Sequence, residues 1–404
     1  MILLGYGKTT QAIAEIFNIQ NIYDDKEMQN SQVIHTSNFP ENIESEIIPT
    51  PAIPPNHWII QKFSEKILSE YDIFYQKAFF PFTIWVSGTN GKTTTTEMIT
   101  YLLNHRFAVS GGNIGIPLGK LDKKASIWVL ETSSFTLHYT KLAKPNLYVL
   151  LPITEDHISW HGSFEEYEKS KLKPIQNLEE GEVAIIPDKY KNIETDGYLI
   201  TYKDSKDLAK KLNLDISKIH FKGGFLLDSI LALAVSKILF DEVDYSKINS
   251  FQKSPHRQEQ FLDFQNRVWI NDSKATNPDS TISILDSFSH KKILLILGGE
   301  DKKADWNLMF KEFQKLDIHL FLIGKSVEKA EKLAQKFNIE YHISNKMDIA
   351  ISQISLLHNL DSVAILSPAS ASFDQFKSYE DRGDYFKKVV NEEKEINKTS
   401  GQSI

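Results

Sequence analysis

The chain has 404 residues, of which 41% are hydrophobic and 25% are charged, and its formal net charge is −7. This length exceeds one ordinary core and predicts a soluble globular protein of two or three domains, with no reason from its charge to bind nucleic acid. Because there is no cysteine, disulfides, thiolate metal sites and a cysteine nucleophile are excluded.

The first block of the chain opens with a strand, a glycine turn and a helix. Strand Ile2–Leu4 precedes the turn Gly5–Gly7, and a helix is expected from Thr10 to Phe17. A second strand over residues 21–23 ends in Asp24-Asp25. This order is typical of a nucleotide-binding βαβ start, but the third glycine of the dinucleotide fingerprint is missing. It therefore favours a uridine nucleotide held by its pyrophosphate over a full NAD site.

Two later blocks repeat the rhythm of short apolar strand, turn and helix. After a proline-rich stretch, a helix is predicted from Ile59 to about Tyr71. The expected strands of the later blocks are Phe82–Val86, Ile127–Leu130, Leu147–Leu150, Val268–Ile270, Ile293–Leu297, Leu320–Ile323 and Ser362–Leu366. Such alternation predicts α/β layers built on parallel sheets. The apolar runs are far shorter than the ~18 residues of a membrane span, and no signal peptide is expected, so a cytoplasmic protein without membrane insertion is predicted.

The strongest motif is a phosphate loop between the strand Phe82–Val86 and a helix expected from Thr94 to Leu103. Its residues are Gly88, Thr89, Asn90, Gly91, Lys92 and Thr93. Glycines let backbone N–H groups close around phosphate oxygens, and the following helix presents its positive end to them. Lys92 adds a cation, and the Thr93 hydroxyl suits Mg²⁺. Ser87 occupies the position of the first glycine of the usual pattern, which departs from generic kinases and motors.

Three further residues in the middle block are candidates for chemistry, and each has an ordinary alternative. Glu131 follows a buried strand, where a carboxylate can hold Mg²⁺ or simply begin a helix. His157 also follows a strand and could ligate a metal, orient a reacting group or be structural. Lys171 lies in a mostly polar helix, and composition alone favours a solvated surface lysine.

In the last block, polar loops follow the predicted strands. These loops contribute the cations Lys274 and Lys302 and the carboxylate Asp272, and the segment that starts the block, residues 255–259, adds Arg257. Together these groups suit nucleotide contacts and an anionic substrate, although ordinary turn chemistry explains each loop alone. A further loop of small residues, Leu366–Asp374, lets backbone and hydroxyl groups approach a ligand closely.

Taken in order, these motifs resemble the Mur ligase family along nearly the whole chain. The resembling segments are residues 88–93, 112–115, 131–135, 156–157, 255–257, 271–277, 298–302 and 366–372. The likeness is closest to members that add D-glutamate to UDP-N-acetylmuramoyl-L-alanine. It implies three domains: a Rossmann-like UDP-substrate domain (1–71), a central ATP-binding domain (72–253) and a C-terminal Rossmann-like amino-acid-binding domain (254–404). It also implies an ATP-dependent ligase of peptidoglycan synthesis that acts as a monomer.

The resemblance also implies a role for individual residues. ATP would contact Gly88, Thr89, Asn90, Gly91, Lys92, Thr93, Thr94, Arg257 and Asp272. Two Mg²⁺ sites would use Thr93, Glu131, His157 and Lys171, the last as a carbamate; the catalytic residues would be Lys92, His157 and Lys171. The UDP-linked substrate would contact Lys8, Thr9, Asp24, Asp25, Asn113 and Ser133. D-Glutamate would contact Thr276, Lys302, Ser372 and Phe373.

The chain departs from the family pattern near the adenine contacts. Asp228 stands where the family often has an adenine-contacting Asn, and Phe225-Leu226 replaces the usual upstream His-Asn pair. Ser370 replaces a frequent Cys. The alternatives that remain open are a sibling ligase for another amino acid, a folylpolyglutamate synthase-like ligase, and a non-catalytic nucleotide-binding switch.

The expected reaction is phosphorylation of a carboxylate by ATP, followed by attack of an amine on the acyl phosphate. Since Arg257, Lys274 and Lys302 lie in a different block from the phosphate loop, domain closure is expected before chemistry.

Overall fold

The computed structural model describes residues 1–27, 30–77, 80–301 and 304–400 and divides into two compact units. The first unit comprises Met1–Phe221 and Phe225–Phe251, and the second comprises Lys222–Gly224 and Gln252–Ile404. The first unit carries two sheets and the second carries one. Among the described residues, every helix is too short or too polar to cross a lipid bilayer.

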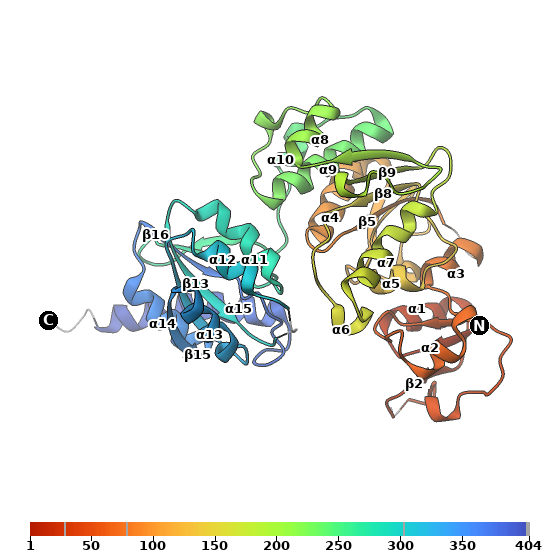
Figure 1. Cartoon of the computed structure of the whole chain (residues 1–404), viewed down its shortest axis with the longest axis horizontal. Coiled ribbons are helices and arrows are strands. Elements are labelled where there is room, and N and C mark those ends of the chain that lie inside the picture. The colour runs from red at the N-terminus through yellow and green to blue at the C-terminus, as the bar shows by residue number, and fades with distance from the viewer. Residues whose placement is uncertain (28–29, 78–79, 302–303, 401–404) are drawn as a thin grey trace. The chain divides into compact units, whose positions relative to one another are not determined.

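The N-terminal part of the first unit is a four-stranded parallel sheet in the order β3-β2-β1-β4 (Figure 1). Its elements are β1 (Ile2–Leu4), α1 (Lys8–Phe17), β2 (Ile22–Asp24), β3 (Val33–His35), the 3₁₀ helix η1 (Thr36–Asn38), β4 (Ile47–Pro49), α2 (Trp58–Lys62), η2 (Ser64–Lys66) and α3 (Glu70–Lys77).

The predicted continuous helix from Ile59 to Tyr71 is wrong. The segment forms α2 and η2, becomes extended, and starts a new helix at Glu70. Ile67 forms a parallel bridge with Ile47, and the Leu68 N–H donates to the Ile47 carbonyl at 3.0 Å. This pairing with the edge of the sheet satisfies backbone groups that a continuous helix would have kept for itself.

The central part of the first unit is a six-stranded parallel sheet in the order β10-β9-β8-β5-β7-β6. Its elements are β5 (Phe82–Ser87), α4 (Lys92–Leu103), η3 (Asn104–Arg106), β6 (Ala108–Gly112), η4 (Leu118–Lys120), β7 (Ile127–Glu131), α5 (Ser134–Tyr139), β8 (Leu147–Leu150), α6 (Ile158–His161), α7 (Phe164–Gln176), β9 (Val183–Pro187), η5 (Asp188–Tyr190), β10 (Tyr198–Tyr202), α8 (Ser205–Lys211), η6 (Ile216–Lys218), α9 (Gly224–Phe240) and α10 (Tyr245–Asn249).

Both faces of the central sheet are covered, which explains why its strands read as continuous apolar runs. In β5, Ile84 and Val86 pack in a core with α4 and α9, whereas Trp85 packs in the core of the opposite face. Figure 1 shows α4 and α9 on one side of the strands and α5 and α7 on the other. The second core also includes Leu3 and Ile48 from the N-terminal sheet. The two sheets of the first unit therefore share one hydrophobic core.

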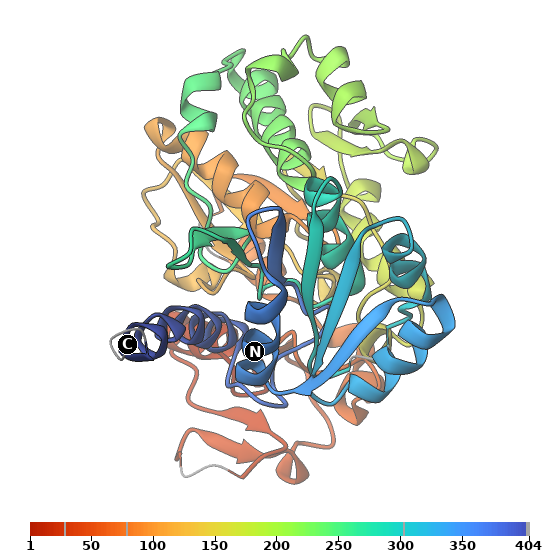
Figure 2. The same ribbon diagram turned by 90° about the vertical axis from the view of Figure 1, so that its left-hand side faces the viewer.

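The second unit is built on a six-stranded sheet in the order β11-β12-β16-β13-β14-β15, whose edge strand β11 is antiparallel (Figure 2). Its elements are β11 (Glu259–Leu262), β12 (Val268–Asn271), α11 (Pro278–Leu285), η7 (Asp286–Phe288), β13 (Lys292–Gly298), α12 (Asn307–Phe313), β14 (Ile318–Ile323), α13 (Val327–Phe337), β15 (Glu340–Asn345), α14 (Met347–Leu357), β16 (Ser362–Leu366) and α15 (Tyr379–Ser400). Alternate residues of β13 face separate cores on its two sides.

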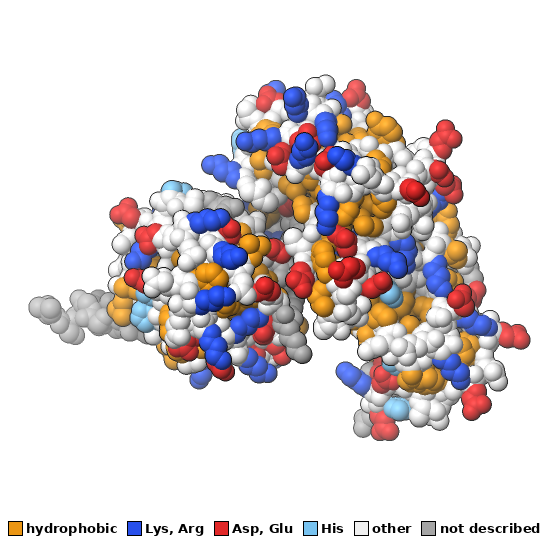
Figure 3. Space-filling view, in the orientation of Figure 1, with side chains coloured by type: hydrophobic (Ala, Val, Ile, Leu, Met, Phe, Trp, Pro, Cys, Tyr) orange, Lys and Arg blue, Asp and Glu red, His pale blue; other side chains and the backbone are white. Residues whose placement is uncertain are grey.

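The observed parallel sheets confirm the predicted α/β class. The predicted boundary between residues 71 and 72 falls inside α3, and the division into three domains at the predicted residues stays a prediction. On the face seen in Figure 3, basic and acidic side chains are interspersed over each unit rather than gathered by sign.

Candidate functional site

The phosphate-loop sequence lies where the central sheet can present it to a ligand. Strand β5 is flanked by β7 and β8, so the carboxyl ends of these three parallel strands lie at one edge of the sheet. Loop 88–91 follows β5, Glu131 ends β7, and His157 lies in the segment after β8. A ligand crevice in an open parallel sheet forms at such an edge, next to a change in strand order.

The two loop glycines are required by backbone shape and by space. Gly88 and Gly91 have φ values of +140° and +83°, which other residues rarely adopt. A Cβ atom on Gly88 would lie 2.5 Å from Cβ of Leu151, and one on Gly91 would lie 2.6 Å from Oδ1 of Asp228. The loop is therefore held tightly against the rest of the sheet edge, with its shape formed before any ligand arrives.

Lys92 folds back over this loop. Its Nζ donates to the carbonyl oxygens of Gly88 at 3.0 Å and Thr89 at 2.7 Å. The Thr89 hydroxyl is itself engaged, because it lies 2.9 Å from the Tyr167 hydroxyl and accepts from the Thr154 N–H. Thr94 is buried in the first turn of α4. A phosphate contact of Thr89 or Thr94 would thus use the backbone rather than the side chain.

A chain of hydrogen bonds runs from the phosphate loop through Glu131. The Thr93 hydroxyl donates to Oε2 of Glu131 at 2.6 Å, and Nδ2 of Asn113 donates to Oε1 at 2.6 Å. Glu131 is the last residue of β7 and is buried, so its alternative reading as an acid in the first turn of a helix is wrong. The hydroxyl of Thr93 and the carboxylate of Glu131 are oxygen donors of the kind that Mg²⁺ prefers.

Lys171 is buried rather than solvated, which corrects the interpretation from composition. It is 1% exposed in α7, and its Nζ donates to the Gly88 carbonyl at 2.7 Å and lies 3.3 Å from the Ser87 hydroxyl. Burial lowers the pKa of Lys171 well below its ordinary value, and the charge of Lys92 lowers it further. The structure thus holds a buried amine of lowered pKa beside the phosphate loop.

His157 lies between β8 and α6, beside Phe135 and Tyr167. It has a left-handed backbone with φ +55° and precedes α6. Its ring lies edge-on to Phe135 at 4.7 Å, and Tyr167 approaches both His157 and Nζ of Lys171. Within the part of the chain that the structure describes, no three His, Asp or Glu side chains form a cluster that could hold a metal ion. The oxygen donors of Thr93 and Glu131 are therefore the better-formed half of the predicted metal sites.

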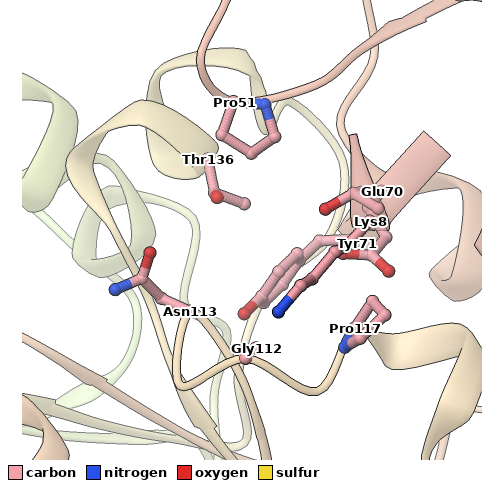
Figure 4. A pocket seen from close by; sticks show the side chains of 10 residues that line it. Lys8, Pro51, Glu70, Tyr71, Gly112, Asn113, Pro117 and Thr136 are labelled. Carbon is pink, nitrogen blue, oxygen red and sulfur yellow. The ribbon is translucent and has the colours of Figure 1, made fainter. Parts of the chain in front are cut away.

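A pocket opens beside Asn113, between the two sheets of the first unit (Figure 4). It is lined by Lys8, Thr9, Pro51, Glu70, Tyr71, Gly112, Asn113, Gly115, Pro117 and Thr136. Lys8 and Thr9 begin α1, so the positive end of that helix faces the pocket. Three of the six residues predicted for the UDP-linked substrate, Lys8, Thr9 and Asn113, are brought together here.

The other three predicted substrate residues make local hydrogen bonds, and their contacts with the UDP-linked substrate stay a prediction. Asp24 accepts from the N–H groups of Tyr6 and Lys26, at 2.6 Å and 2.8 Å. Asp25 accepts from the Thr36 hydroxyl, which lowers the pKa of Asp25, and also contacts His57. Ser133 caps α5 by accepting from the Thr136 N–H. None of Asp24, Asp25 and Ser133 lines the pocket.

Sequence reasoning missed several residues that line this pocket. Two of them, Glu70 and Tyr71, lie in the segment that was predicted as one helix, and a third, Thr136, lies in α5. No phosphate-binding motif includes any of the three. Glu70 accepts from the Leu118 N–H at 2.9 Å, and its burial raises the pKa of Glu70 to about 8. Apolar neighbours on both sides in Ile67–Phe74 are the one sequence signal that this segment is buried.

In the second unit, the predicted ATP-contacting carboxylate is fully enclosed. Asp272 follows β12 and accepts from the Ser367 hydroxyl at 2.9 Å and the Gln258 N–H at 3.2 Å. Burial raises the pKa of Asp272 to about 7, although both hydrogen bonds and the charge of Arg257 oppose this rise. Asp272 thus ties the segment that follows Arg257 to the loop after β16.

The predicted D-glutamate residues are spread over neighbouring loops of the same unit. Thr276 follows Asp272, Ser372 is buried, and Phe373 is 70% exposed. Lys302 lies outside the described residues. Sequence reasoning missed Arg382 of α15, which is buried and donates to Ser273 and to the carbonyls of Ser370 and Ala371. Arg382 therefore joins the loop after β12 to the small-residue loop after β16.

Comparison with known proteins gives concordant results. Residues 86–226 match the model for the Mur ligase middle domain, and residues 256–369 match the model for the Mur ligase, glutamate ligase domain. A UDP-N-acetylmuramoylalanine–D-glutamate ligase of Campylobacter jejuni is 47% identical over 399 residues, covering 96% of this chain and 98% of the relative. The enzyme of the same name from Helicobacter pylori is 38% identical over 416 residues, with the same coverage.

Solved structures show the same fold at low identity. MurF ligase from Thermotoga maritima in complex with ADP aligns with a TM-score of 0.62 and 16% identity, covering 98% of this chain and 95% of that one. Folylpolyglutamate synthase of Mycobacterium tuberculosis aligns with a TM-score of 0.56 and 14% identity, covering 78% of this chain and 93% of that one.

Proposed function

The chain belongs to the Mur ligase family, and from this premise we propose that it joins D-glutamate to UDP-N-acetylmuramoyl-L-alanine at the expense of ATP. The enzyme is an ATP-dependent ligase of peptidoglycan synthesis. Relatives at 47% and 38% identity over nearly the full chain carry the name of this ligase, which supports D-glutamate over another amino acid. We propose that the reaction takes place in the cytoplasm and that the enzyme acts as a monomer.

One observation carries the proposal: the hydrogen-bonded chain from Thr93 through Glu131 to Asn113. Thr93 belongs to the phosphate loop, and Asn113 lines the pocket beside α1. These hydrogen bonds thus connect a loop suited to a triphosphate with a pocket suited to an anionic nucleotide-linked substrate. In this arrangement the substrate carboxylate would lie at the Asn113 end of the pocket, next to the γ-phosphate.

The residues of the loop would bind and orient ATP. The N–H groups of loop 88–91 and the start of α4 would hold the phosphates, and Lys92, which now donates to the Gly88 and Thr89 carbonyls, would turn to the phosphate oxygens. Thr93 and Glu131 would hold Mg²⁺, which neutralises charge on the transferring phosphoryl group. His157 and Lys171 are proposed for a second Mg²⁺.

Lys171 can serve a second metal only after its charge changes. An ammonium repels a cation, whereas a carbamate formed from the neutral amine and CO₂ is an anion with oxygen donors. The lowered pKa of Lys171 favours the neutral amine that this reaction needs. We therefore propose that Lys171 is carbamylated in the active enzyme.

Residues of the second unit would bind D-glutamate and make further contacts with ATP. Arg257 and Asp272 are proposed for ATP, and Thr276, Lys302, Ser372 and the backbone at Phe373 for the amino acid. The amine of D-glutamate attacks the acyl phosphate, forming the C–N bond as the C–O bond to phosphate breaks. Phosphate leaves, and the amine gives up its proton to solvent or a nearby base.

The test is release of phosphate with an amino-acid panel. Purified protein with ATP, Mg²⁺ and UDP-N-acetylmuramoyl-L-alanine should release phosphate with D-glutamate and far less with L-glutamate, glycine, L-alanine or L-lysine. Phosphate release that ignores the UDP-linked substrate, or a preference for another amino acid, would contradict the proposal. ATP binding without turnover would favour a nucleotide-binding switch.

A further inference from the structure

Glu70 is a buried carboxyl at the wall of the pocket. It is the first residue of α3, is 7% exposed, and lines the pocket together with Lys8 and Thr9 (Figure 4). Its Oε1 accepts from the Leu118 N–H at 2.9 Å. Among the residues that the structure describes, burial and backbone N–H groups, rather than a charged partner, set the pKa of Glu70. A buried carboxyl without a cation partner is costly, so its position calls for a reason.

The segment that Glu70 holds is the loop from Gly112 to Leu118, which contributes Gly112, Asn113, Gly115 and Pro117 to the lining of the pocket. At the start of the loop, the Asn113 N–H donates to the Glu131 carbonyl at 2.9 Å, and Gly112 N–H closes a turn on the Ile116 carbonyl at 2.8 Å. At its far end, Leu118 N–H reaches Glu70. A Cβ atom on Gly115 would meet nothing within 4 Å, so the loop is open on that side.

Asn113 is the residue of this loop whose side chain donates to Glu131, beside the phosphate loop. Its Nδ2 contacts Glu131, which in turn accepts from Thr93. We propose that Glu70 is a positioning residue for the UDP-linked substrate: by fixing the far end of loop 112–118, it sets where Asn113 and the pocket wall stand. This inference rests on the proposed function for the identity of the ligand.

The protonation of Glu70 suggests the variant that should preserve its role. Burial raises the pKa of Glu70 to about 8, so near neutral pH the side chain mostly carries its proton. Glutamine has the same length, is neutral, and its carbonyl oxygen can still accept from Leu118 N–H. Aspartate keeps the carboxyl but is one methylene shorter, and alanine removes the acceptor.

Asp72 offers a matched control on the same helix. It is fully buried two residues after Glu70, and its carboxylate accepts from the N–H groups of Lys141, Leu142 and Ala143. It therefore fastens α3 to another loop in the same way, but it does not line the pocket. Loss of Asp72 should weaken the fold without a selective effect on one substrate.

The experiment measures KM for each of the three substrates in the full-length enzyme carrying Glu70→Ala, Glu70→Asp, Glu70→Gln or Asp72→Asn. In Glu70→Ala and Glu70→Asp, KM for UDP-N-acetylmuramoyl-L-alanine should rise on the order of tenfold, while KM for ATP and D-glutamate stays within about twofold. Glu70→Gln should resemble the unaltered enzyme. Asp72→Asn should lower Tm and leave the ratio of the three KM values unchanged.

Several results would overturn the inference. These are an unchanged KM for the UDP-linked substrate in folded Glu70→Asp, an equal rise for all three substrates, or the same selective rise in Asp72→Asn. If Glu70→Ala does not fold, Glu70→Asp carries the test.

Amide hydrogen exchange separates this inference from the proposed function. Exchange in residues 113–118 should be faster in Glu70→Asp than in Glu70→Gln, whatever the enzyme's substrate is. Equal exchange would contradict the role of Glu70, whereas an unaltered enzyme that is indifferent to the UDP-linked substrate would contradict the proposed function.

Discussion

Lys92 and Lys171 donate to the same acceptor: the Gly88 carbonyl oxygen takes hydrogen bonds from Nζ of both side chains, at 3.0 Å and 2.7 Å. Lys92 begins α4 and Lys171 lies in α7, so two lysine side chains from separate helices converge on one backbone atom. Burial and the nearby charge of Lys92 both lower the pKa of Lys171. This juxtaposition gives a physical reason for a neutral, reactive amine at this position.

Replacement of Lys171 should abolish most activity. Because methionine fills the space but cannot form a carbamate, Lys171→Met should lower kcat on the order of 100-fold or more. The matched control is Lys169→Met on the exposed side of the same helix, which should be neutral. If the carbamate forms, native mass spectrometry shows added CO₂, and bicarbonate restores activity to CO₂-depleted enzyme. An active Lys171→Met enzyme would refute the role.

Glu131→Gln should weaken the binding of the Mg²⁺ that the reaction requires. Glutamine retains an oxygen acceptor for Asn113 and a polar partner for Thr93, so the local fold should survive. The lost negative charge should raise the Mg²⁺ concentration for half-maximal rate on the order of tenfold. A Mg²⁺ titration of phosphate release measures this, with exposed Glu165→Gln as the control. An unchanged titration midpoint would argue against Glu131 as a ligand.

Gly91→Ala should damage the phosphate loop by collision as well as by backbone strain. Its Cβ atom would lie 2.6 Å from Oδ1 of Asp228, so the loop or α9 must shift. Since small displacements at reacting groups cost on the order of 100-fold in rate, kcat/KM for ATP should fall by about that factor. Gly181→Ala shares the left-handed backbone but meets nothing within 4 Å, so it should leave catalysis intact. Equal effects of the two changes would rule out the collision.

Asp272 should make the second unit less stable as pH rises. Its pKa is about 7 in the folded protein, against 3.8 for an exposed aspartate, so the folded state retains a proton that the unfolded state has lost. The stabilising contribution is fully present below pH 3.8 and is lost as pH rises through 7.

Asp272→Asn cannot ionise, so the fall in stability between these pH values should become shallower, by at most about 1.4 kcal/mol per pH unit. Urea unfolding at a series of pH values measures this slope. Asp361→Asn, an exposed change in the same unit, is the control. Identical slopes for Asp272→Asn and the unaltered protein would contradict the assignment.

Some expectations failed because distant residues decided them. The segment from Ile59 to Tyr71 has helical periodicity, but pairing of Ile67 with Ile47 broke it. Lys171 reads as a surface lysine because its sequence neighbours are polar, yet its partners are more than 80 residues away. Glu70 belongs to no recognisable motif. Its proposed role depends on Leu118, which comes within hydrogen-bond distance only when the chain folds.

Local sequence patterns were enough to predict many strands of the parallel sheets, the phosphate loop and the family likeness, but not the strands β3, β4, β6, β9, β10 and β15. Those features depend on local patterns: apolar runs buried on both faces, and glycines where the backbone turns sharply. The burial of Lys171 beside Lys92 and the hydrogen bonds of Glu131 with Thr93 and Asn113 became apparent only in the folded structure. The same is true of the side chains that line the pocket. Burial, charge and pKa depend on neighbours in space, and long-range packing alone selects those neighbours.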